Sequence, residues 1–379
     1  MAPSGDTRAS LARERLAVER VWFDDGVGER ATRLALMPLE LAYRGVVGVR
    51  NAFYDHGVLT VHPTALPTVS VGNLTVGGTG KTPVSAWIAA ELASRGARPA
   101  LVLRGYGEDE PLVHEQLNPA VPVVVAADRV AGVARAKADH GATIAVLDDA
   151  FQHRRARRDV DVVLLSADRW VAGRRRHMLP AGPWREPLGA LRRASLVVVT
   201  RKAASPVRAE DALGAALRAA PGVASAVIHL APGGLRRVAQ DDDDKVASDA
   251  PDTARDLSAL DGATVLALSA VGDAGAFHGQ LMAAGARLTP GPVAFPDHYR
   301  FTTDDAARLA GEGARAEYVV CTLKDAVKLG PLWPRGAPPL WYVSQRVVLE
   351  RGRESVDRLI AGLVALAVGD GRAPASTTV

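Results

Sequence analysis

The fold of this chain is decided by one stretch, Gly72-Asn-Leu-Thr-Val-Gly-Gly-Thr-Gly-Lys-Thr-Pro83. It follows a short apolar run, Thr68-Val-Ser-Val71, and precedes a helical pattern over residues 81–95. A glycine-rich loop between a strand and a helix is typical of a phosphate-binding loop, whose backbone N–H groups surround phosphate oxygens. The usual pattern begins with a glycine, and Thr75 takes that position here. The stretch predicts a P-loop NTPase-like domain.

The residue types of this loop suit a nucleoside triphosphate and Mg²⁺. Lys81 would bring a full positive charge to the β- and γ-phosphates, and the Thr82 hydroxyl is a ligand for Mg²⁺. The helix that starts here adds partial positive charge at its N-terminus. The residues expected to contact the nucleotide are Thr75, Val76, Gly77, Gly78, Thr79, Gly80, Lys81 and Thr82.

A second nucleotide-site element is the apolar run Ile144-Ala-Val-Leu-Asp-Asp149. It reads as a strand that ends in two carboxylates, Asp148 and Asp149. In P-loop proteins an aspartate at this place holds Mg²⁺ directly or through water. The alternative is an aspartate pair that only caps the following turn.

The rest of the chain alternates between strand and helix patterns. Continuous Val/Leu/Ile runs at 100–103, 121–125, 143–147, 160–165 and 196–199 predict strands covered on both faces, and 128–140 predicts a helix. This alternation predicts a doubly wound α/β sheet. Strands at 264–268, 318–322 and 340–343 predict a second, smaller α/β domain. The expected boundaries are 1–225 for the P-loop domain with an N-terminal helix, 226–350 for the smaller domain, and 351–379 for a C-terminal helix and a disordered tail.

Composition excludes several classes of protein. Of 379 residues, 48% are apolar and 23% charged, which is typical of a soluble protein. The single cysteine, Cys321, excludes a disulfide framework and a cysteine metal cluster, and its apolar neighbours predict a buried thiol. The first residues lack the apolar core of a signal peptide, and the longest apolar run, 359–368, is too short to span a membrane. We therefore expect a cytoplasmic protein.

Two features leave a membrane surface open as a partner. Arginines crowd residues 154–193, which predicts either a solvated surface or a site for an anionic substrate or membrane. Nucleic acid is not expected, because no aromatic residues interleave with these arginines. Residues 32–57 predict an amphipathic helix that either packs on the protein's own core or docks on a membrane interface. Its apolar positions are Leu34, Met37, Leu41, Val46, Val47 and Val49, and its polar ones include Glu40, Arg44 and Arg50.

Further segments, in their joint order and spacing, make the chain similar to a known family over about residues 38–350. They are Arg50-Asn-Ala-Phe-Tyr-Asp-His-Gly57, Gly72–Pro83, Arg104-Gly-Tyr-Gly107, Asp148-Asp-Ala-Phe-Gln-His153, Arg158-Asp159, Leu179-Pro-Ala-Gly-Pro-Trp-Arg-Glu-Pro-Leu188, Phe295-Pro-Asp-His298 and Lys324-Asp-Ala-Val-Lys-Leu329. With these segments the sequence resembles tetraacyldisaccharide 4'-kinase, the lipid A 4'-kinase of Gram-negative bacteria.

The resemblance implies an activity, a location and site residues. ATP would phosphorylate the 4'-hydroxyl of a lipid A disaccharide 1-phosphate in a cleft between the two domains. The enzyme would be peripheral on the cytoplasmic face of the inner membrane, with residues 32–57 on an anionic membrane surface. The implied catalytic residues are Asp109 as the base, His298 to orient it, Lys81 and Asp149. The residues that would hold Mg²⁺ are Thr82, Glu110, Asp148 and Asp149. The residues that would line the acceptor side are Gln152, His153, Arg185 and Glu186.

The chain departs from the family at three places. Gly107-Glu-Asp-Glu-Pro111 directly follows the Arg104–Gly107 turn, so a hairpin of the family is missing, and Asp109 and Glu110 align with the acids of its G-D-E-P motif. Ala270-Val-Gly-Asp-Ala274 and Thr322-Leu-Lys-Asp325 replace family motifs of the second domain, which bears on contacts to the nucleotide base.

Two rival classes share parts of this pattern. A P-loop GTPase or metallochaperone-like switch protein would need a guanine-reading N-K-x-D element, which the sequence lacks. A non-catalytic, ATP-dependent membrane-binding module would not need the concentration of carboxylates around the loop.

Overall fold

The computed structural model describes residues 18–105, 107, 109–173, 175–238, 253–272, 274–296 and 299–369. Contacts divide the chain into two compact units. The P-loop unit contains residues 18–105, 117–229 and 347–369, and the smaller unit contains residues within 107–116 and 230–346. Two strands, β7 (Ala224–Arg237) and β13 (Leu340–Arg351), carry the chain from one unit into the other. The expected tail at 370–379 lies outside the described residues.

The P-loop unit is built on a parallel sheet with the strand order β3-β2-β4-β1-β5-β6-β7. Its strands are β1 (Thr68–Asn73), β2 (Pro99–Leu103), β3 (Val123–Val125), β4 (Ile144–Asp148), β5 (Val160–Ser166), β6 (Leu196–Arg201) and β7. The predicted strand at 121–125 begins only at Val123, because the N–H of Val121 closes a turn onto the Asn118 carbonyl. The structure otherwise confirms the predicted P-loop NTPase-like, doubly wound α/β sheet.

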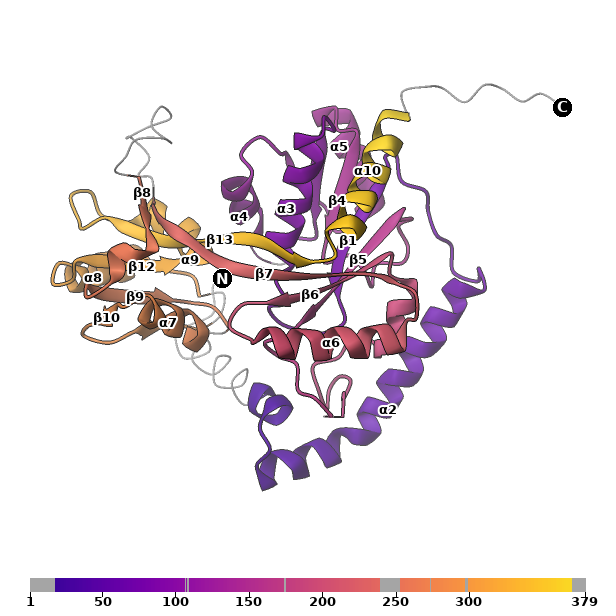
Figure 1. Ribbon diagram of the computed structural model, residues 1–379, viewed down its shortest axis with the longest axis horizontal. Helices are drawn as coiled ribbons and strands as arrows, with labels where there is room; N and C mark the ends of the chain where they lie inside the picture. The colour runs from indigo at the N-terminus through magenta and orange to yellow at the C-terminus, as the bar shows by residue number, and fades with distance from the viewer. Residues whose placement is uncertain are drawn as a thin grey trace. The chain divides into compact units, whose positions relative to one another are not determined.

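Helices cover both faces of this sheet (Figure 1). Helix α5 (Arg129–His140) packs on β2 and β4, and α6 (Pro206–Ala219) packs on β5 and β6. Helix α3 (Lys81–Ser94) joins β1 to β2, and this connection runs in the direction opposite to the one from β3 to β4 that contains α5. Because both crossovers are right-handed, α3 lies on the face of the sheet opposite to α5. Helix α10 (Arg353–Gly369) packs against α3 on that face. Local signals set the ends of α5, since Asp128 caps its first turn and Gly141 ends it with a φ of 59°.

A long helix, α2 (Val27–Asp55), precedes β1 and is longer at its start than the predicted 32–57. Its amphipathic pattern is inverted. The apolar side chains of Leu34, Leu41 and Val46 are 65%, 64% and 67% exposed, whereas Arg33 and Glu40 are buried. Arg33 and Glu40 of α2 therefore face the protein, and the partly buried Val47 packs on the core beside them.

The smaller unit has a sheet with the order β10-β9-β12-β13-β7; β11 pairs with β9, and β8 runs antiparallel to β7. Its helix α8 begins with a capping box of Thr302 and Asp305. Cys321 is buried in β12, as predicted, and burial raises the pKa of its thiol. The remaining bounds are α4 (Asp109–Leu117), β8 (Ala254–Asp256), β9 (Thr264–Ser269), α7 (Ala274–Ala283), β10 (Arg287–Leu288), β11 (Val293–Ala294), α8 (Thr303–Gly313), β12 (Tyr318–Thr322) and α9 (Leu323–Leu329), with 3₁₀ turns η1 (Leu188–Arg193), η2 (Leu257–Leu260) and η3 (Gly330–Leu332).

Within the described ranges, none of the helices combines the length and the apolar character needed to cross a membrane.

Candidate active site

The phosphate loop and the aspartate pair follow two neighbouring strands. β1 and β4 are hydrogen-bonded in parallel, with Val71 opposite Asp148. From β1 the chain crosses to β2 on one side, and from β4 it returns to β5 on the other. Ligands of doubly wound sheets bind at such a switch point, at the carboxyl ends of the strands.

The phosphate loop is held in shape by its own glycines and by buried side chains. Gly77 and Gly80 have φ angles of 103° and 84°, which only glycine adopts at low cost. The Asn73 amide donates to the Thr79 hydroxyl over 2.8 Å, and the Thr200 hydroxyl donates to the Thr79 carbonyl over 2.8 Å. The loop therefore keeps its geometry through its own residues and through Thr200 at the end of a neighbouring strand.

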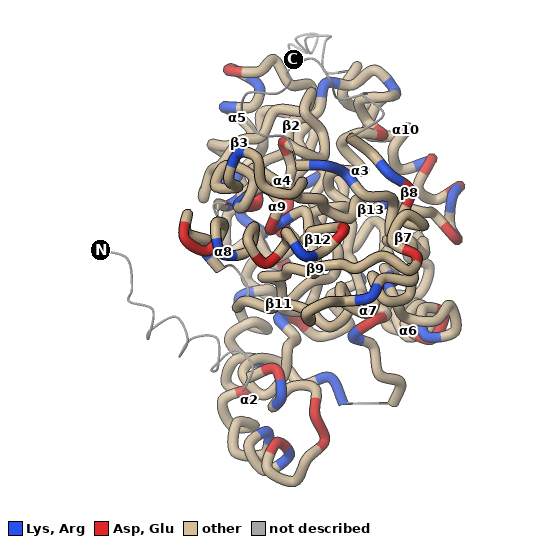
Figure 2. The backbone as a smooth tube through the Cα atoms, turned by 90° about the vertical axis from the view of Figure 1, so that its left-hand side faces the viewer, with Lys and Arg blue, Asp and Glu red and all other residues tan. Residues whose placement is uncertain are grey.

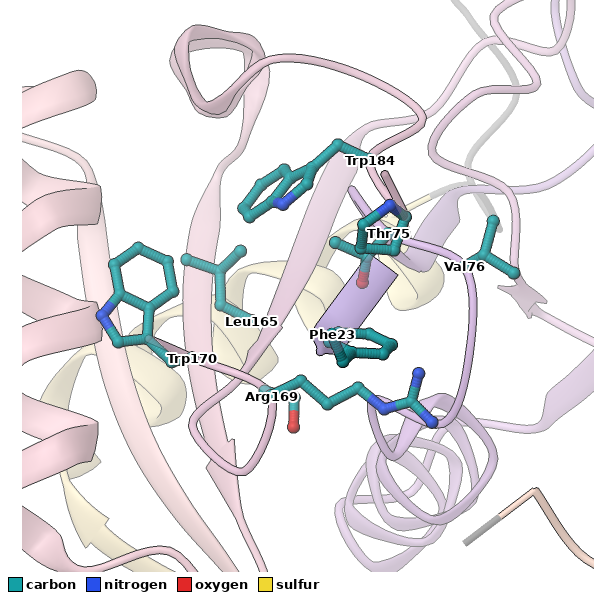
Figure 3. Close-up of a pocket in the computed structure, with 9 residues that line it drawn as sticks. Phe23, Thr75, Val76, Leu165, Arg169, Trp170 and Trp184 are labelled. Carbon is teal, nitrogen blue, oxygen red and sulfur yellow. The ribbon is translucent and has the colours of Figure 1, made fainter. Parts of the chain in front are cut away.

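A second segment, residues 183–185, is hydrogen-bonded to the backbone of the loop. The N–H of Val76 donates to the Pro183 carbonyl over 2.7 Å, and the N–H of Arg185 donates to the Leu74 carbonyl over 2.7 Å. Figure 3 shows the apolar and aromatic residues that pack there around a cavity of about 30 Å³. These residues include Phe23, Leu165, Trp170 and Trp184.

Arg169, which also lines this cavity, lies against the loop. A Cβ atom added to Gly77 would lie 2.4 Å from the Arg169 Nη1 atom, so the guanidinium occupies the space beside that glycine. The guanidinium also stacks on Phe23, 5.2 Å from the ring centroid, and pairs with Glu19 at 3.6 Å.

Asp149 contacts one residue of the phosphate loop and one residue of the expected acceptor side. Arg185 Nη1 donates to both of its carboxylate oxygens, over 3.0 and 3.2 Å, and Lys81 Nζ lies 3.7 Å from Oδ1. Asp149 is the one non-glycine residue with positive φ, 48°, among the described residues. Aspartate tolerates this left-handed conformation better than most residues. The turn after β4 thus presents its carboxylate to both cations.

Asp148 points toward helix α3 instead. Its side chain is buried, and its Oδ1 accepts hydrogen bonds from the Ser85 hydroxyl over 3.0 Å and from the Asp149 N–H over 2.9 Å. The turn-capping alternative is therefore realised in part, by the bond to the Asp149 N–H.

The oxygen ligands around the loop suit Mg²⁺, which phosphates and waters also coordinate, rather than a metal held by the protein alone. Among the described residues, no three His, Cys, Asp or Glu side chains form a metal cage. Mg²⁺ is usually bound through one or two carboxylates together with substrate phosphates and waters. The Asp149 carboxylate, which is 35% exposed, and the partly exposed Thr82 offer such hard oxygen ligands.

Gln152 and Glu186 form the inner part of the expected acceptor side. The Gln152 amide donates to the Asn73 carbonyl over 2.8 Å and to Glu186 Oε1 over 3.2 Å. Asn51 of α2 and Arg193 donate to Glu186 Oε2 over 2.8 and 2.5 Å. Glu186 is only 1% exposed, so it acts as a buried hub for three donors.

Arg185 and Glu186, which are neighbours in sequence, do not form an ion pair with each other. Arg185 pairs with Asp149, and Glu186 pairs with Arg193. Burial explains the difference, because a carboxylate removed from water needs several donors around it.

The polar side of α2 contacts the backbone of the same residues. The Tyr43 hydroxyl donates to the Arg185 carbonyl over 3.2 Å, and Arg50 Nη2 donates to the Gln152 carbonyl over 2.7 Å. Together with Asn51, these contacts fix α2 to the acceptor side.

His153 stands apart from this network. Its side chain makes no hydrogen bond to Gln152, Arg185 or Glu186 within the described parts of the chain. Burial and the nearby Arg129 guanidinium lower the pKa of His153 below its ordinary value, so the imidazole is neutral at neutral pH.

The expected base and its partner belong to other parts of the chain. Asp109 and Glu110 begin helix α4, which clusters with the smaller unit, and Asp109 is buried. His298 lies outside the described residues.

Several arginines of the arginine-rich segment, residues 154–193, contact other side chains of the P-loop unit. The pairs are Arg154–Asp55, Arg155–Asp128, Arg158–Asp161 and Arg193–Glu186, and Arg176 stacks on Trp170.

Sequence reasoning missed several residues that shape the site. Asn73 and Thr200 hold the phosphate loop, Ser85 holds Asp148, and Asn51 holds Glu186. Asn73 and Asn51 lie in quoted motifs, which was a usable signal, whereas Thr200 ends an apolar strand and carried none.

These features define a P-loop nucleotide-binding protein in which a second polar cluster, built on Gln152, Arg185 and Glu186, lies next to the phosphate loop. The profile of the family described as "Tetraacyldisaccharide-1-P 4'-kinase" matches residues 32–109 and 108–364. The chain belongs to this family, and it is a kinase.

Similar proteins agree with this assignment. A tetraacyldisaccharide 4'-kinase of Anaeromyxobacter sp. (strain Fw109-5) is 39% identical, over 93% of this chain and 97% of that protein. The kinase of the same name from Halorhodospira halophila is 33% identical, over 94% and 100%. LpxK of Aquifex aeolicus, solved in complex with ATP, superposes with a TM-score of 0.66 at 27% identity, over 88% of this chain and 99% of that one. None of these supports the GTPase alternative.

Proposed function

We propose that this kinase transfers the γ-phosphoryl group of ATP to the 4'-hydroxyl of a tetraacyldisaccharide 1-phosphate, a lipid A precursor. The bond between the γ-phosphorus and the β–γ bridging oxygen breaks, and a bond from the acceptor oxygen forms. The products are ADP, the 4'-phosphorylated disaccharide and the hydroxyl proton, which a carboxylate must accept.

The observation that carries this proposal is the position of Asp149 between Lys81 and Arg185. Lys81 belongs to the nucleotide motif and Arg185 to the acceptor-side motif, and one carboxylate holds both. Phosphoryl transfer depends mainly on positioning and on neutralising phosphate charge. Two cations fixed beside the phosphate loop supply both.

The remaining roles rest on the family motifs. Residues Thr75 to Thr82 cradle the phosphates, and Asp109 accepts the hydroxyl proton. His298 orients Asp109, while Gln152 and Arg185 bind the acceptor. Glu186 and His153 shape this side without a direct contact, since one is a buried hub and the other stands apart from its hydrogen bonds.

Mg²⁺ would be held by Thr82 and Asp149, with Asp148 acting through water and Glu110 as a further ligand. When bound, the ion neutralises charge on the β- and γ-phosphates.

An ATP assay with and without the disaccharide 1-phosphate lipid tests the function. We expect ADP release that depends on the lipid. A GTPase-like switch protein would hydrolyse its nucleotide without lipid, and a non-catalytic module would release no ADP in either case. Either result would overturn the kinase assignment for this lipid.

We also propose that the enzyme docks on the cytoplasmic face of the inner membrane through α2. The exposed side of this helix is apolar, and its polar side is held by the protein. Only Tyr43 and Val47 pack on the core of the P-loop unit, and most of the other apolar side chains of the helix face outward. An apolar side turned outward suits the boundary between lipid headgroups and acyl chains.

Flotation with vesicles tests the docking. Binding should be stronger with anionic lipid and weaken with salt, because each basic contact near such a surface contributes roughly 1 kcal/mol. The absence of any association at low salt would remove the docking proposal and leave the kinase assignment intact.

A further inference from the structure

A hollow of about 330 Å³ opens between the first half of α2 and the segment that follows β5. Both belong to the P-loop unit. Four basic side chains and one acid contribute to its lining, which consists of Asp25, Arg30, Arg33, Leu34, Met37, Arg175 and His177. Figure 2 shows basic positions along α2.

Part of the lining is fixed by the protein. The Arg33 guanidinium, which is buried, donates to the carbonyls of Val21 and Asp24 over 2.6 and 2.7 Å and to Asp25 over 3.2 Å. This set of bonds neutralises the one acid of the lining.

The opposite wall is held by Glu40 of α2. Its carboxylate accepts from the Met178 N–H over 3.0 Å and pairs with His177 over 2.8 Å. Burial opposes ionisation, but these donors and Arg44 keep the pKa of Glu40 below its usual range. The segment that carries Arg175 is therefore anchored next to α2.

Two other arginines of the lining are not held in this way. Arg30 and Arg175 are exposed, and neither makes an ion pair or a side-chain hydrogen bond within the described ranges. They come from different elements and meet over one hollow. Guanidinium groups match the oxygens of a phosphate group in geometry as well as in charge.

The hollow also adjoins the apolar side of α2. Leu34, which is 65% exposed, belongs to both. A molecule bound there through a phosphate would have its apolar part beside the apolar side of the helix.

We propose that this hollow binds the phosphate headgroup of an anionic phospholipid of the bilayer. The proposal rests on the docking of α2 and adds a specific contact to it. The acceptor-side contact of Asn51 lies about 27 Å from Arg33 along the axis of α2. That separation favours a bulk lipid over the 1-phosphate of a disaccharide held at the acceptor side.

The test uses the full chain and the double variant Arg30→Gln/Arg175→Gln. Its matched control is Arg98→Gln/Arg353→Gln, which removes the same charge from two exposed arginines near the amino ends of β2 and β7. Binding is measured with vesicles of phosphatidylcholine alone and of phosphatidylcholine with phosphatidylglycerol. Turnover of detergent-dispersed substrate shows that each variant is folded.

We expect the site variant to bind neutral vesicles as the wild type does. Its affinity for the phosphatidylglycerol vesicles should fall by about fivefold for each arginine, and that of the control variant by much less. Equal losses in both variants would mean diffuse electrostatic attraction and would overturn the site. An unchanged affinity in the site variant would overturn it as well.

Three further outcomes separate the sources of phosphate and the two proposals. Displacement from phosphatidylglycerol vesicles by inorganic phosphate at constant ionic strength would assign the hollow to a free anion. A higher KM of the site variant for substrate in neutral vesicles would assign it to the substrate's own phosphate. Wild-type binding without preference for phosphatidylglycerol would overturn the headgroup site but leave docking intact, and no wild-type binding to either vesicle would overturn both.

Discussion

Lys81 is the residue whose charge the reaction needs most directly. Its Nζ atom lies 3.7 Å from the Asp149 carboxylate, which Arg185 also contacts. Lys81→Ala should lower kcat by roughly 10²-fold or more, because a charge that stabilises the transferring phosphoryl group is lost.

Steady-state turnover measures this loss, and circular dichroism verifies that the variant is folded. Near-normal turnover in a folded Lys81→Ala protein would contradict the assignment of the phosphate loop.

Gly77 tests the loop through its backbone. Its φ of 103° disfavours any side chain, and an added Cβ would displace the Arg169 guanidinium. Strain of this kind costs on the order of 1–3 kcal/mol, so Gly77→Ala should weaken ATP binding roughly tenfold. Isothermal titration with a non-hydrolysable ATP analogue measures it.

Gly78 is the matched control for this substitution. No atom lies within 4 Å of its added Cβ, and its φ is not positive. Gly78→Ala should therefore bind the analogue almost as the wild type does. Similar losses in both variants would show that the loop responds to any added bulk.

The site residues differ in how far the sequence could predict them. Gly77, Lys81 and Asp149 lie in short motifs whose neighbours in sequence are also their neighbours in space. Glu186 was expected to line the acceptor side, and in the structure its carboxylate is buried and accepts from Asn51 and other donors. That environment depends on a partner 135 positions away, which no local pattern encodes.

At the scale of elements, Glu186 joins α2, the turn after β4 and η1. Glu186→Ala should lower the free energy of unfolding by about 3 kcal/mol, because Arg193 and Asn51 lose a buried acceptor. Glu210→Ala is the control, since Glu210 and its partner Arg351 are each more than half exposed. It should cost less than about 1 kcal/mol.

Urea denaturation followed by tryptophan fluorescence measures both variants. If the two substitutions cost the same, the hub does not stabilise the contact between α2 and the acceptor side.

Helix α2 shows which of its features the periodicity of the sequence predicts and which it does not. The sequence predicted its two sides, since the spacing of Leu34 and Leu41 against Glu40 is local. It left open which side faces the protein. In the structure Glu40 and Asn51 contact distant segments and Val47 packs on the core, whereas Leu34, Leu41 and Val46 stay exposed.

At the scale of the whole molecule, the chain divides differently from its linear order. Helix α4 lies between β2 and β3 in sequence but clusters with the smaller unit. The sequence could not predict this, because the main segment of the smaller unit, residues 230–346, begins more than 100 positions beyond α4 and the family's hairpin before it is missing. Asp109, at the start of α4, is therefore the residue where turnover and nucleotide binding should separate.

If Asp109 accepts the hydroxyl proton, Asp109→Ala should lower kcat by roughly 10²–10⁴-fold, the usual contribution of a general base. ATP affinity should change little, because the base acts on the acceptor hydroxyl and does not touch the β-phosphate. Glu108→Ala should be mild, and Glu110→Ala should raise the Mg²⁺ requirement. His298→Ala should flatten the acid limb of the pH–rate profile, since that residue tunes the same carboxylate.

The three neighbouring acids make this series self-controlled. Turnover, its Mg²⁺ dependence and ATP binding are measured on each variant under the same conditions. An active Asp109→Ala with an inactive Glu108→Ala would move the base by one residue. If both stay active, the base lies elsewhere, and Asp148 is the next residue to test, although its buried carboxylate already accepts from Ser85. A loss of ATP binding in Asp109→Ala would instead tie this residue to the nucleotide, and its role as a base would no longer explain the loss of turnover.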